Sequence, residues 1–508
     1  MLAAALLISA LSLRWPTTPS YDPWSWLLWG RQIVHGHLSL KANGSSWKPM
    51  PVAFTTVFAL FGSAAPNLWL LVARAGFMLT LMMSFRYAWR IVLGLQPPVA
   101  SASTLAAVVR STPAVLAGAI AVVGIGLTHG FPGNSLLGYS ESVATAATMI
   151  AAERAVDGHH RQAFALGLFA ALDRPESWAL WAPYGLWLLW KQPTARRLVV
   201  TLAALAIVVW IVPQRLGGQS AVGLASTNHS SYSAANSSFP LWQELHTVEW
   251  SLVLTRVKLV GIATLLVCCV SIARRWLRTR SLRPTDAHQQ AVLWIALLGL
   301  FGFAWWIGIA IETQFGFAGN PRYAVFGSIP EYVVGGVGYA WAAIAVASGS
   351  GSLLAKLQVR ISQHLRLGAM TALLAVIFLG LPGWVGGSLL PVKALRDLLR
   401  YQGRIREETV ALIDANGGDQ ALLDCGPIVT ESHQVPMLAW YLNTTTDRIG
   451  ASLYADPTQP ASVIFQVAAQ TGGPLEPDDD VIGQWEALGR DYQITLTDPI
   501  NFYKDCRK

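Results

Sequence analysis

Residues 259–273 read LVGIATLLVCCVSIA, and residues 202–212 read LAALAIVVWIV. Neither run contains a charged side chain, and similar apolar runs recur along the first 390 residues. About 20 mostly apolar residues are enough for a helix to cross the hydrocarbon core of a bilayer. Repeated runs of this kind predict a polytopic α-helical membrane protein.

The composition of the whole chain agrees with this prediction. Of 508 residues, 53% are hydrophobic and 13% are charged, and the mean hydropathy is +0.43. Soluble domains carry about 25% charged residues, so a water-soluble enzyme and a disordered protein are both excluded. We expect about eleven transmembrane helices, near residues 1–13, 66–85, 112–128, 138–152, 162–172, 177–190, 198–213, 249–273, 291–311, 324–348 and 369–390.

Charge divides the chain near residue 390. Residues 1–390 have a formal charge of +15, and residues 391–508 have a formal charge of −7. The second segment also has the composition of a soluble domain. We expect a transmembrane catalytic domain over 1–390, with a first outer loop at about 14–65 and a Ser- and Asn-rich outer loop at about 214–246. The second loop is either a mobile lid or a plain linker. A helix over 394–418 and strand-like runs over 421–430, 462–469 and 492–497 predict a small α/β domain over 391–508.

The basic residues between the spans predict the orientation. With the N-terminus inside, the cytoplasmic loops hold sixteen Lys and Arg residues and the outer loops hold seven, as the positive-inside rule requires. The C-terminal domain is then extracytoplasmic, where its Cys425 and Cys506 are expected to form a disulfide. We expect a multi-pass protein of a bacterial plasma membrane. The basic residues lie in short loops within the bilayer protein, which argues against a nucleic-acid partner.

The first outer loop concentrates groups that suit sugar chemistry. Trp24 follows Asp22 closely, and Lys48 lies further along the loop. Aromatic rings stack on sugar faces, and a lone carboxylate can act as a general base. Asp22 followed by Pro23 is equally typical of a helix N-cap and its first helical residue, so both interpretations of Asp22 stay open here.

Two further outer segments hold candidate substrate-binding residues. Asp173, Arg174 and Glu176 surround Pro175, and either they bind a lipid phosphate or a sugar hydroxyl, or Pro175 and Glu176 simply begin a helix. Glu141 at the start of a predicted span either contacts sugar or caps that helix.

Arginines and a lysine further along the chain are candidate phosphate ligands. Arg322 with Tyr323 could bind a phosphate through the guanidinium, or could anchor the segment at the membrane interface. Arg256 and Lys258 lie two residues apart and therefore point in different directions on a helix. Residues 249–258 are expected as an interfacial helix, with the span beginning near Leu259.

Three short motifs together resemble a family. YDPWSW at 21–26, LDRPESW at 172–178 and FAGNPRY at 317–323 are similar to outer-loop segments of GT-C glycosyltransferases, multi-span enzymes that use polyprenyl-phosphate sugars. The resemblance extends to bacterial, including actinobacterial, mannosyl- and arabinofuranosyltransferases, and it implies that Asp22 is the catalytic base. Pro23 stands where the family often has a second acidic residue.

The resemblance implies an inverting transfer of a sugar from a polyprenyl-phosphate donor to a glycan or glycolipid acceptor of the cell envelope, on the outer face. Two alternatives stay open: a lipid-linked polysaccharide ligase or polymerase, and a non-enzymatic lipid or glycan flippase or carrier. The sequence identifies no metal ligands, because the H-x-H of His35 and His37 has no acidic neighbour. A divalent cation stays open as a cofactor.

Overall fold

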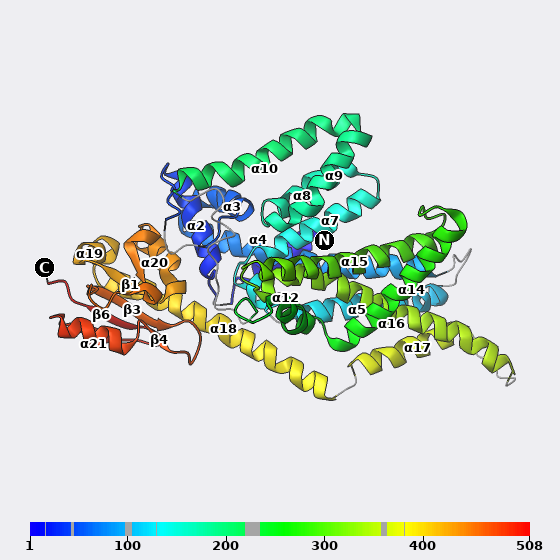
Figure 1. Cartoon of the computed structure of the whole chain (residues 1–508). Coiled ribbons are helices and arrows are strands. Elements are labelled where there is room, and N and C mark those ends of the chain that lie inside the picture. Colours follow the sequence, from blue (N-terminus) through cyan, green and yellow to red (C-terminus); the bar gives the residue numbers. More distant parts are fainter. Residues whose placement is uncertain are drawn as a thin grey trace. The chain divides into compact units, whose positions relative to one another are not determined.

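The computed structural model is mostly helical and divides into two compact units. It describes residues 1–15, 17–41, 45–96, 104–128, 130–218, 234–356, 363–379 and 382–507. Figure 1 shows the elements in sequence colours. Unit 1 contains Met1–Met78, Gly133–Leu224 and Lys393–Lys508, and unit 2 contains Leu79–Pro132 and Ala225–Val392.

Membrane-spanning helices are present as predicted. Six helices among the described residues are long and apolar enough to cross a bilayer: Gly62–Leu95, Val108–Gly126, Pro193–Leu216, Thr255–Thr279, Ala287–Gln314 and Pro321–Ser348. The chain is therefore a polytopic α-helical membrane protein. Several other predicted spans form shorter helices, so the number of eleven stays a prediction.

Unit 2 is a bundle of long helices. It contains the later part of α4 (Ala65–Leu95), with α5 (Thr104–Gly126), α14 (Thr255–Thr279), α15 (Ala287–Gln314), α16 (Pro321–Lys356) and α17 (Gln363–Leu379). Helix α16 packs against α5 so closely that a Cβ atom at Gly336 would overlap the carbonyl oxygen of Ala117. Small residues at such crossings are typical of membrane helix packing, because they let two backbones approach.

The outer loop predicted over 214–246 lies only partly within the described residues. Residues 219–233 are outside them. The described end of the loop forms short helices in unit 2, namely α12 (Pro240–Gln243), the π-helix η4 (Glu244–Glu249) and α13 (Trp250–Leu252). Part of the segment expected as a lid or linker is therefore helical.

Unit 1 begins with helices from the first half of the chain. They are α1 (Leu2–Ser12), α2 (Tyr21–Val34), α3 (Pro49–Ala59), the 3₁₀ turn η1 (Gly62–Ala64), the start of α4, α7 (Glu141–Val156), α8 (His160–Ala171), η2 (Pro175–Ser177), α9 (Trp178–Lys191), η3 (Pro193–Ala195) and α10 (Arg196–Leu216). The short helix α6 (Phe131–Leu136) lies across the boundary between the units.

Helices α2 and α3 give the first outer loop a defined structure. They cross so closely that a Cβ atom at Gly30 would lie 2.5 Å from the carbonyl carbon of Thr55. Ten of the fourteen residues of α2 are buried. The first outer loop is therefore largely a packed helical element of unit 1, and its side chains hold fixed positions.

The C-terminal domain is a small α/β fold, as predicted. Helix α18 (Pro382–Ala415) leads into it and is followed by α19 (Gly418–Cys425), α20 (Val435–Tyr441) and α21 (Asp479–Ala487). Its strands are β1 (Ile428–Thr430), β2 (Ile449–Ala451), β3 (Val463–Ala468), β4 (Leu475–Glu476), β5 (Gln493–Leu496) and β6 (Asn501–Lys504). The expectation of a strand over 421–430 was partly wrong, because residues 421–425 belong to α19.

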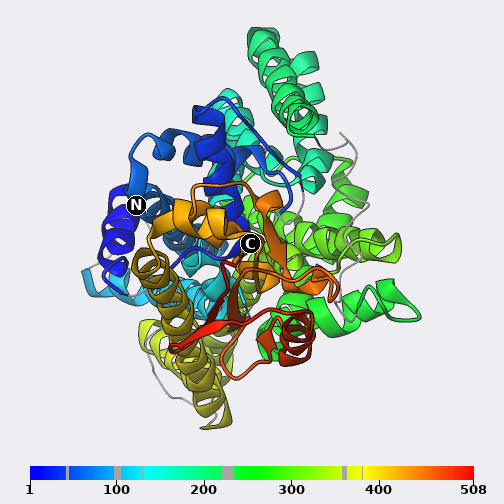
Figure 2. The ribbon, with the colours of Figure 1, turned by 90° about the vertical axis from the view of Figure 1, so that its left-hand side faces the viewer.

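The sheet of this domain combines parallel and antiparallel pairs. Its order is β2-β1-β3-β6-β5, with β4 paired to β3. Strand β1 is parallel to both β2 and β3, with Val429 opposite Ile464 of β3, whereas β6 is antiparallel to β3 and β5. Figure 2 shows this domain facing the viewer, in orange and red. A disulfide joins Cys425 to Cys506, whose Cα atoms lie 4.6 Å apart.

Helix α2 is the element on which the C-terminal domain docks. Trp24 lies 6.0 Å from Trp440 of α20 and 5.6 Å from Tyr441, measured between ring centroids. Arg31 donates Nη1 to the carbonyl oxygen of Trp440 at 2.8 Å and lies over its ring. The first outer loop and the C-terminal domain are thus parts of one compact unit.

Candidate active site

Asp22 lies in the first turn of α2 and does not cap it. The N-cap residue is Ser20, with an extended backbone, and Asp22 is the second helical residue. The N-cap interpretation of Asp22 was therefore wrong. Asp22 is buried, at 6% exposure, and a carboxylate in a first turn is favoured by the helix dipole.

A short segment before α7 joins the start of α2 to a buried polar cluster. Ser20 donates its backbone N–H to the carbonyl oxygen of Leu137 at 2.9 Å, and its hydroxyl lies 3.4 Å from the Tyr139 hydroxyl. The next residue, Ser140, accepts a hydrogen bond from Lys48 Nζ at 3.3 Å. Residues 137–141 therefore contact the first turn of α2 at one end and Lys48 at the other.

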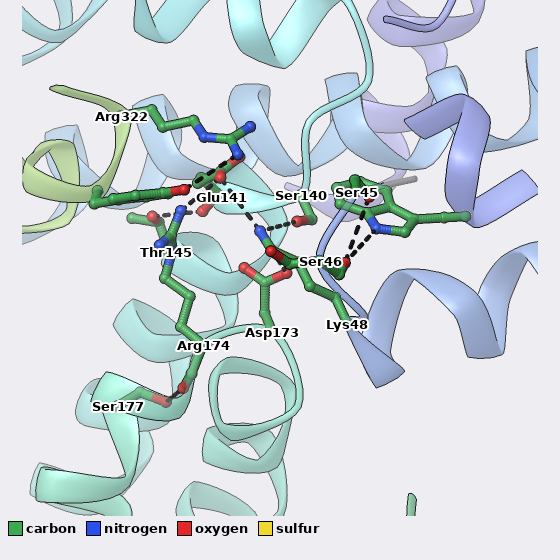
Figure 3. Close-up of polar contacts among 12 residues, drawn as sticks. Ser45, Ser46, Lys48, Ser140, Glu141, Thr145, Asp173, Arg174, Ser177 and Arg322 are labelled. Atoms are coloured by element: carbon green, nitrogen blue, oxygen red, sulfur yellow. Dashed lines mark hydrogen bonds and ion pairs between the residues drawn. The ribbon is translucent and has the colours of Figure 1, made fainter. Parts of the chain in front are cut away.

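Lys48 is the cation of this cluster closest to α2. Its Nζ lies 3.4 Å from Glu141 Oε1 and 3.8 Å from Asp173 Oδ1 (Figure 3). It also lies 5.3 Å from the ring centroid of Trp26. Since Trp26 follows Asp22 by four residues, the two share a face of α2. Lys48 therefore contacts the helix that carries Asp22.

Arg174 completes the cluster from the turn between α8 and η2. Its Nη2 donates to Glu141 Oε1 at 2.6 Å, and its Nη1 lies 3.7 Å from Glu176 Oε1. Pro175 begins the 3₁₀ turn η2, with Arg174 at its N-cap position, so the helix-start interpretation of this segment describes the backbone correctly. The same turn nevertheless aims Arg174 at Glu141 (Figure 3).

The cluster carries opposite charges in a site closed to solvent. Lys48, Glu141 and Arg174 are each at most 6% exposed, and Asp173 is fully buried. Burial raises the pKa of Asp173 and the nearby Glu141 carboxylate raises it further, whereas the charge of Lys48 opposes this shift. Buried charges are costly unless they are paired. Two cations held beside two carboxylates at this depth form a preorganised polar site.

Trp24 packs against the C-terminal domain in this structure. Its ring is 1% exposed and packs between α2 and α20, and its indole N–H donates to the Thr18 hydroxyl at 3.2 Å. The ring thus contributes to the contact between α2 and the C-terminal domain. A substrate-binding role of Trp24 stays a prediction.

The candidate residues of unit 2 lie on two helices, Arg256 and Lys258 on α14, and Arg322 and Tyr323 on α16. Arg256 is exposed and Lys258 is fully buried, so they point in different directions as predicted. Lys258 lies 3.6 Å from the Trp250 ring centroid and donates to the carbonyl oxygen of Trp250. The expectation of a separate interfacial helix over 249–258 was wrong, because both residues belong to the continuous helix α14. The Trp250 contacts make Lys258 a packing residue.

Arg322 and Tyr323 lie at the start of α16. Arg322 Nη2 lies 3.4 Å from the Tyr323 hydroxyl, and the backbone N–H of Arg322 donates to Asn320 Oδ1 at 3.1 Å. Tyr323 is buried, and its carbonyl oxygen accepts from the Trp305 indole at 2.8 Å. These contacts fix the orientation of the FAGNPRY segment.

Sequence reasoning missed three residues that touch this region. Ser140 contacts Lys48, and Glu431 and His433 of the C-terminal domain lie beside Tyr21. No local motif marks Glu431 and His433, which are about 410 positions from Tyr21 in the sequence. Among the described residues, no group of three or more His, Cys, Asp or Glu side chains could hold a metal ion.

Comparison with solved structures identifies the fold. The chain is similar to ArnT from Cupriavidus metallidurans in the apo state, with a TM-score of 0.52 and 11% identity, over 99% of this chain and 96% of that one. The chain therefore shares the overall fold of that protein. ArnT from the same organism bound to undecaprenyl phosphate also matches, with a TM-score of 0.47 and 13% identity, over 99% and 96% of the two chains. No family model and no curated protein sequence matches the chain.

At 11% identity this likeness concerns the fold alone, and the activity has to be argued from the residues of the site. That argument rests on the buried cluster of Lys48, Glu141, Asp173 and Arg174 in unit 1.

Proposed function

We propose that the protein is an integral-membrane glycosyltransferase that moves a sugar from a polyprenyl-phosphate donor to a cell-envelope glycan or glycolipid. The observation that carries this proposal is the buried cluster around Lys48, whose Nζ lies 5.3 Å from the ring centroid of Trp26 on α2, the helix that also carries Asp22. Such a site combines the two groups that the reaction requires, a base and a cation.

In the proposed reaction, Asp22 removes the proton of an acceptor hydroxyl. The hydroxyl oxygen then forms a bond to the anomeric carbon from the face opposite the phosphate, so the configuration inverts. The bond between the anomeric carbon and the phosphate oxygen breaks, and its electron pair stays on the polyprenyl phosphate. A phosphate leaves without being protonated, so cationic stabilisation takes the place of a general acid.

Lys48 is the residue of unit 1 best placed to bind that phosphate. Its distances of 3.4 and 3.8 Å to Glu141 and Asp173 are longer than an optimal ion-pair hydrogen bond of about 2.8 Å. A phosphate oxygen can therefore compete for its ammonium protons. Arg174 is held more tightly, at 2.6 Å from Glu141, and positions that carboxylate beside Lys48.

The membrane orientation belongs to the same proposal. We place the N-terminus in the cytoplasm and the C-terminal domain outside a bacterial plasma membrane, because basic residues concentrate in the loops that are then cytoplasmic. In this arrangement Asp22 and Lys48 both belong to the first outer loop. The acceptor therefore approaches from the extracytoplasmic side.

The test is a transfer assay with purified protein. Radiolabelled polyprenyl-phosphate sugars are incubated with a panel of octyl glycosides, and labelled product and released polyprenyl phosphate are measured. We expect both to appear together with wild-type protein and to be lost in Lys48→Met. The matched control is Lys41→Met, because Lys41 is an exposed lysine of the same loop. A carrier would bind the donor without either product, and this outcome would refute the proposal.

A further inference from the structure

The C-terminal domain presents a histidine that is held by a buried carboxylate. Glu431 directly follows β1, is 1% exposed, and accepts from the His433 backbone N–H at 3.0 Å and from its ring nitrogen Nδ1 at 2.7 Å. The His433 side chain itself is 66% exposed. A buried carboxylate that orients an accessible imidazole leaves the second ring nitrogen, Nε2, free to meet a ligand.

The position of this pair in the sheet is typical of a ligand site. Glu431 lies at the carboxyl end of β1, which pairs in parallel with β2 on one side and β3 on the other. Ligands of α/β folds bind outside the carboxyl ends of parallel strands, because loops diverge there and leave a crevice. His433 follows in the turn that leads from this edge into α20.

The pair faces the start of α2, where Asp22 lies. The His433 and Tyr21 rings meet edge to face, with centroids 5.5 Å apart. The hydrogen bond to Glu431 is the largest influence on His433 and raises its pKa, and the negative charges of Asp22 and Glu476 raise it further. Asp22 directly follows Tyr21 in α2, next to the residue whose ring meets His433. Helix α20 holds this arrangement by packing on α2.

Hydroxyl, carboxylate and aromatic groups surround the pair. The Ser432 and Ser452 hydroxyls lie 3.3 Å apart, and Ser452 donates to Glu476 Oε2 at 2.5 Å. Tyr454 is 76% exposed. Burial raises the pKa of Tyr21, and the nearby Asp22 and Tyr454 raise it further, so Tyr21 keeps its hydroxyl proton. Saccharides are bound by such groups, through hydrogen bonds to their hydroxyls and packing on their ring faces.

We propose that the C-terminal domain completes the active site, and that His433, oriented by Glu431, binds the acceptor saccharide beside Asp22. The inference rests on the proposed glycosyl transfer and adds to it the group that holds the acceptor. The C-terminal domain is then a functional part of the site, in addition to its structural contacts with α2. A purely structural lock between the two elements is the competing explanation.

The experiment separates acceptor binding from donor binding and from folding. In the octyl glycoside assay, His433→Gln removes the imidazole and keeps a polar side chain. We expect its KM for the acceptor to rise on the order of 10-fold to 100-fold, the effect of losing a hydrogen bond to a charged group. The KM for the donor and the melting temperature should stay near wild type. The matched control is His37→Gln, an exposed histidine of the same unit.

Two further variants keep the proposal falsifiable if His433→Gln folds poorly. Tyr454→Ala removes an exposed ring and should raise the KM for the acceptor with an unchanged melting temperature. Glu431→Gln keeps the shape of the side chain but removes its negative charge. Because Glu431 acts by positioning His433 and raising its pKa, this variant should lose acceptor binding at a lower pH than the wild type. If wild-type protein transfers sugar while His433→Gln and Tyr454→Ala keep a normal KM for the acceptor, the inference is wrong. If wild-type protein transfers no sugar, the proposed function itself fails.

Discussion

The Arg31 guanidinium lies 4.4 Å from the ring centroid of Trp440, and its Nη1 donates to the carbonyl oxygen of the same residue at 2.8 Å. A third contact joins it to the carbonyl oxygen of Ala439 at 3.3 Å. Arg31 belongs to the helix that carries Asp22, and Trp440 belongs to the C-terminal domain. One side chain therefore ties the candidate catalytic helix to a domain that begins more than 350 residues later.

Arg31→Ala should loosen this docking. Loss of charged hydrogen bonds typically costs about 1.5–3 kcal/mol, so we expect a lower melting temperature in detergent and faster proteolysis between α18 and α19. Transfer activity should fall with it, because α2 loses part of its support. Arg448→Ala, at an exposed arginine of the same domain, is the control. Equal protease resistance of Arg31→Ala and wild type would count against the docking role.

Asp22→Asn tests the proposed base. The change keeps the size of the side chain and removes its ability to accept a proton, so turnover should fall by a factor on the order of 10²–10⁴. Loss of the helix-dipole interaction costs only about 0.3–1 kcal/mol, and the melting temperature should change little. Asp480→Asn, at an exposed carboxylate of α21, should keep full activity. Near-normal turnover of Asp22→Asn would move the search for the base to Glu141, Asp173 and Glu176.

Glu141 and Arg174 should be energetically coupled. Removing one partner of a buried ion pair typically costs about 3–5 kcal/mol, because the other charge is left buried. Arg174→Met and Glu141→Gln should each destabilise the protein strongly, and the double variant should be more stable than the sum of the two effects predicts. The measurement is a double-mutant cycle on thermal unfolding. Strict additivity would show that the 2.6 Å contact is not a working pair.

His433 should give the transfer reaction an alkaline limit. Its pKa is raised by the hydrogen bond to Glu431 and by the charges of Asp22 and Glu476, and it contacts the neutral phenol of Tyr21. A raised pKa keeps the imidazolium charged above the usual value of about 6.5. Acceptor binding that uses this charge is therefore complete below that pH and declines as pH rises through the raised pKa. The pH profile of 1/KM for the acceptor should lose this decline in His433→Gln.

The orientation of the C-terminal domain can be tested by chemical labelling in intact cells. A cysteine introduced at Gly472, an exposed position between β3 and β4, should react with a membrane-impermeant maleimide. A cysteine at Ser281, between α14 and α15, should react only after lysis. Cys425 and Cys506 should resist alkylation without reductant, because a disulfide joins them and the outer compartment is oxidising. Labelling of Gly472 only after lysis would reverse the proposed topology.

The fold was predictable because its signal is local. Apolar runs such as 202–212 and 259–273 each became part of a helix long enough to span a bilayer, and the helical text at 394–418 lies mostly within α18. The thickness of the bilayer sets the length of a spanning segment, and the lack of water inside it requires a helix. A spanning helix can therefore be predicted from the composition of the segment alone. The interruption at 421–425 was missed, because five residues can continue as helix or as strand with equal ease.

The site was predictable only where its residues lie in recognisable local segments. Asp22, Glu141 and Arg174 each lie at or beside the beginning of a helix, and the sequence shows such positions. The role of Trp24 could not be decided from the sequence, since a ring that packs and a ring that stacks on sugar look alike there. The Glu431–His433 pair could not be found at all, because its meaning depends on Tyr21 across a contact between distant segments.

The buried charge cluster also constrains how this protein can vary between species. Lys48, Glu141, Asp173 and Arg174 are almost without solvent, so a substitution at one of them leaves an opposite charge without compensation. A substitution of one of these residues persists only if the oppositely charged residue paired with it is substituted as well. We therefore expect Glu141 and Arg174 to be inherited together or replaced together among related chains, as a co-varying pair that aligned sequences would reveal without any assay.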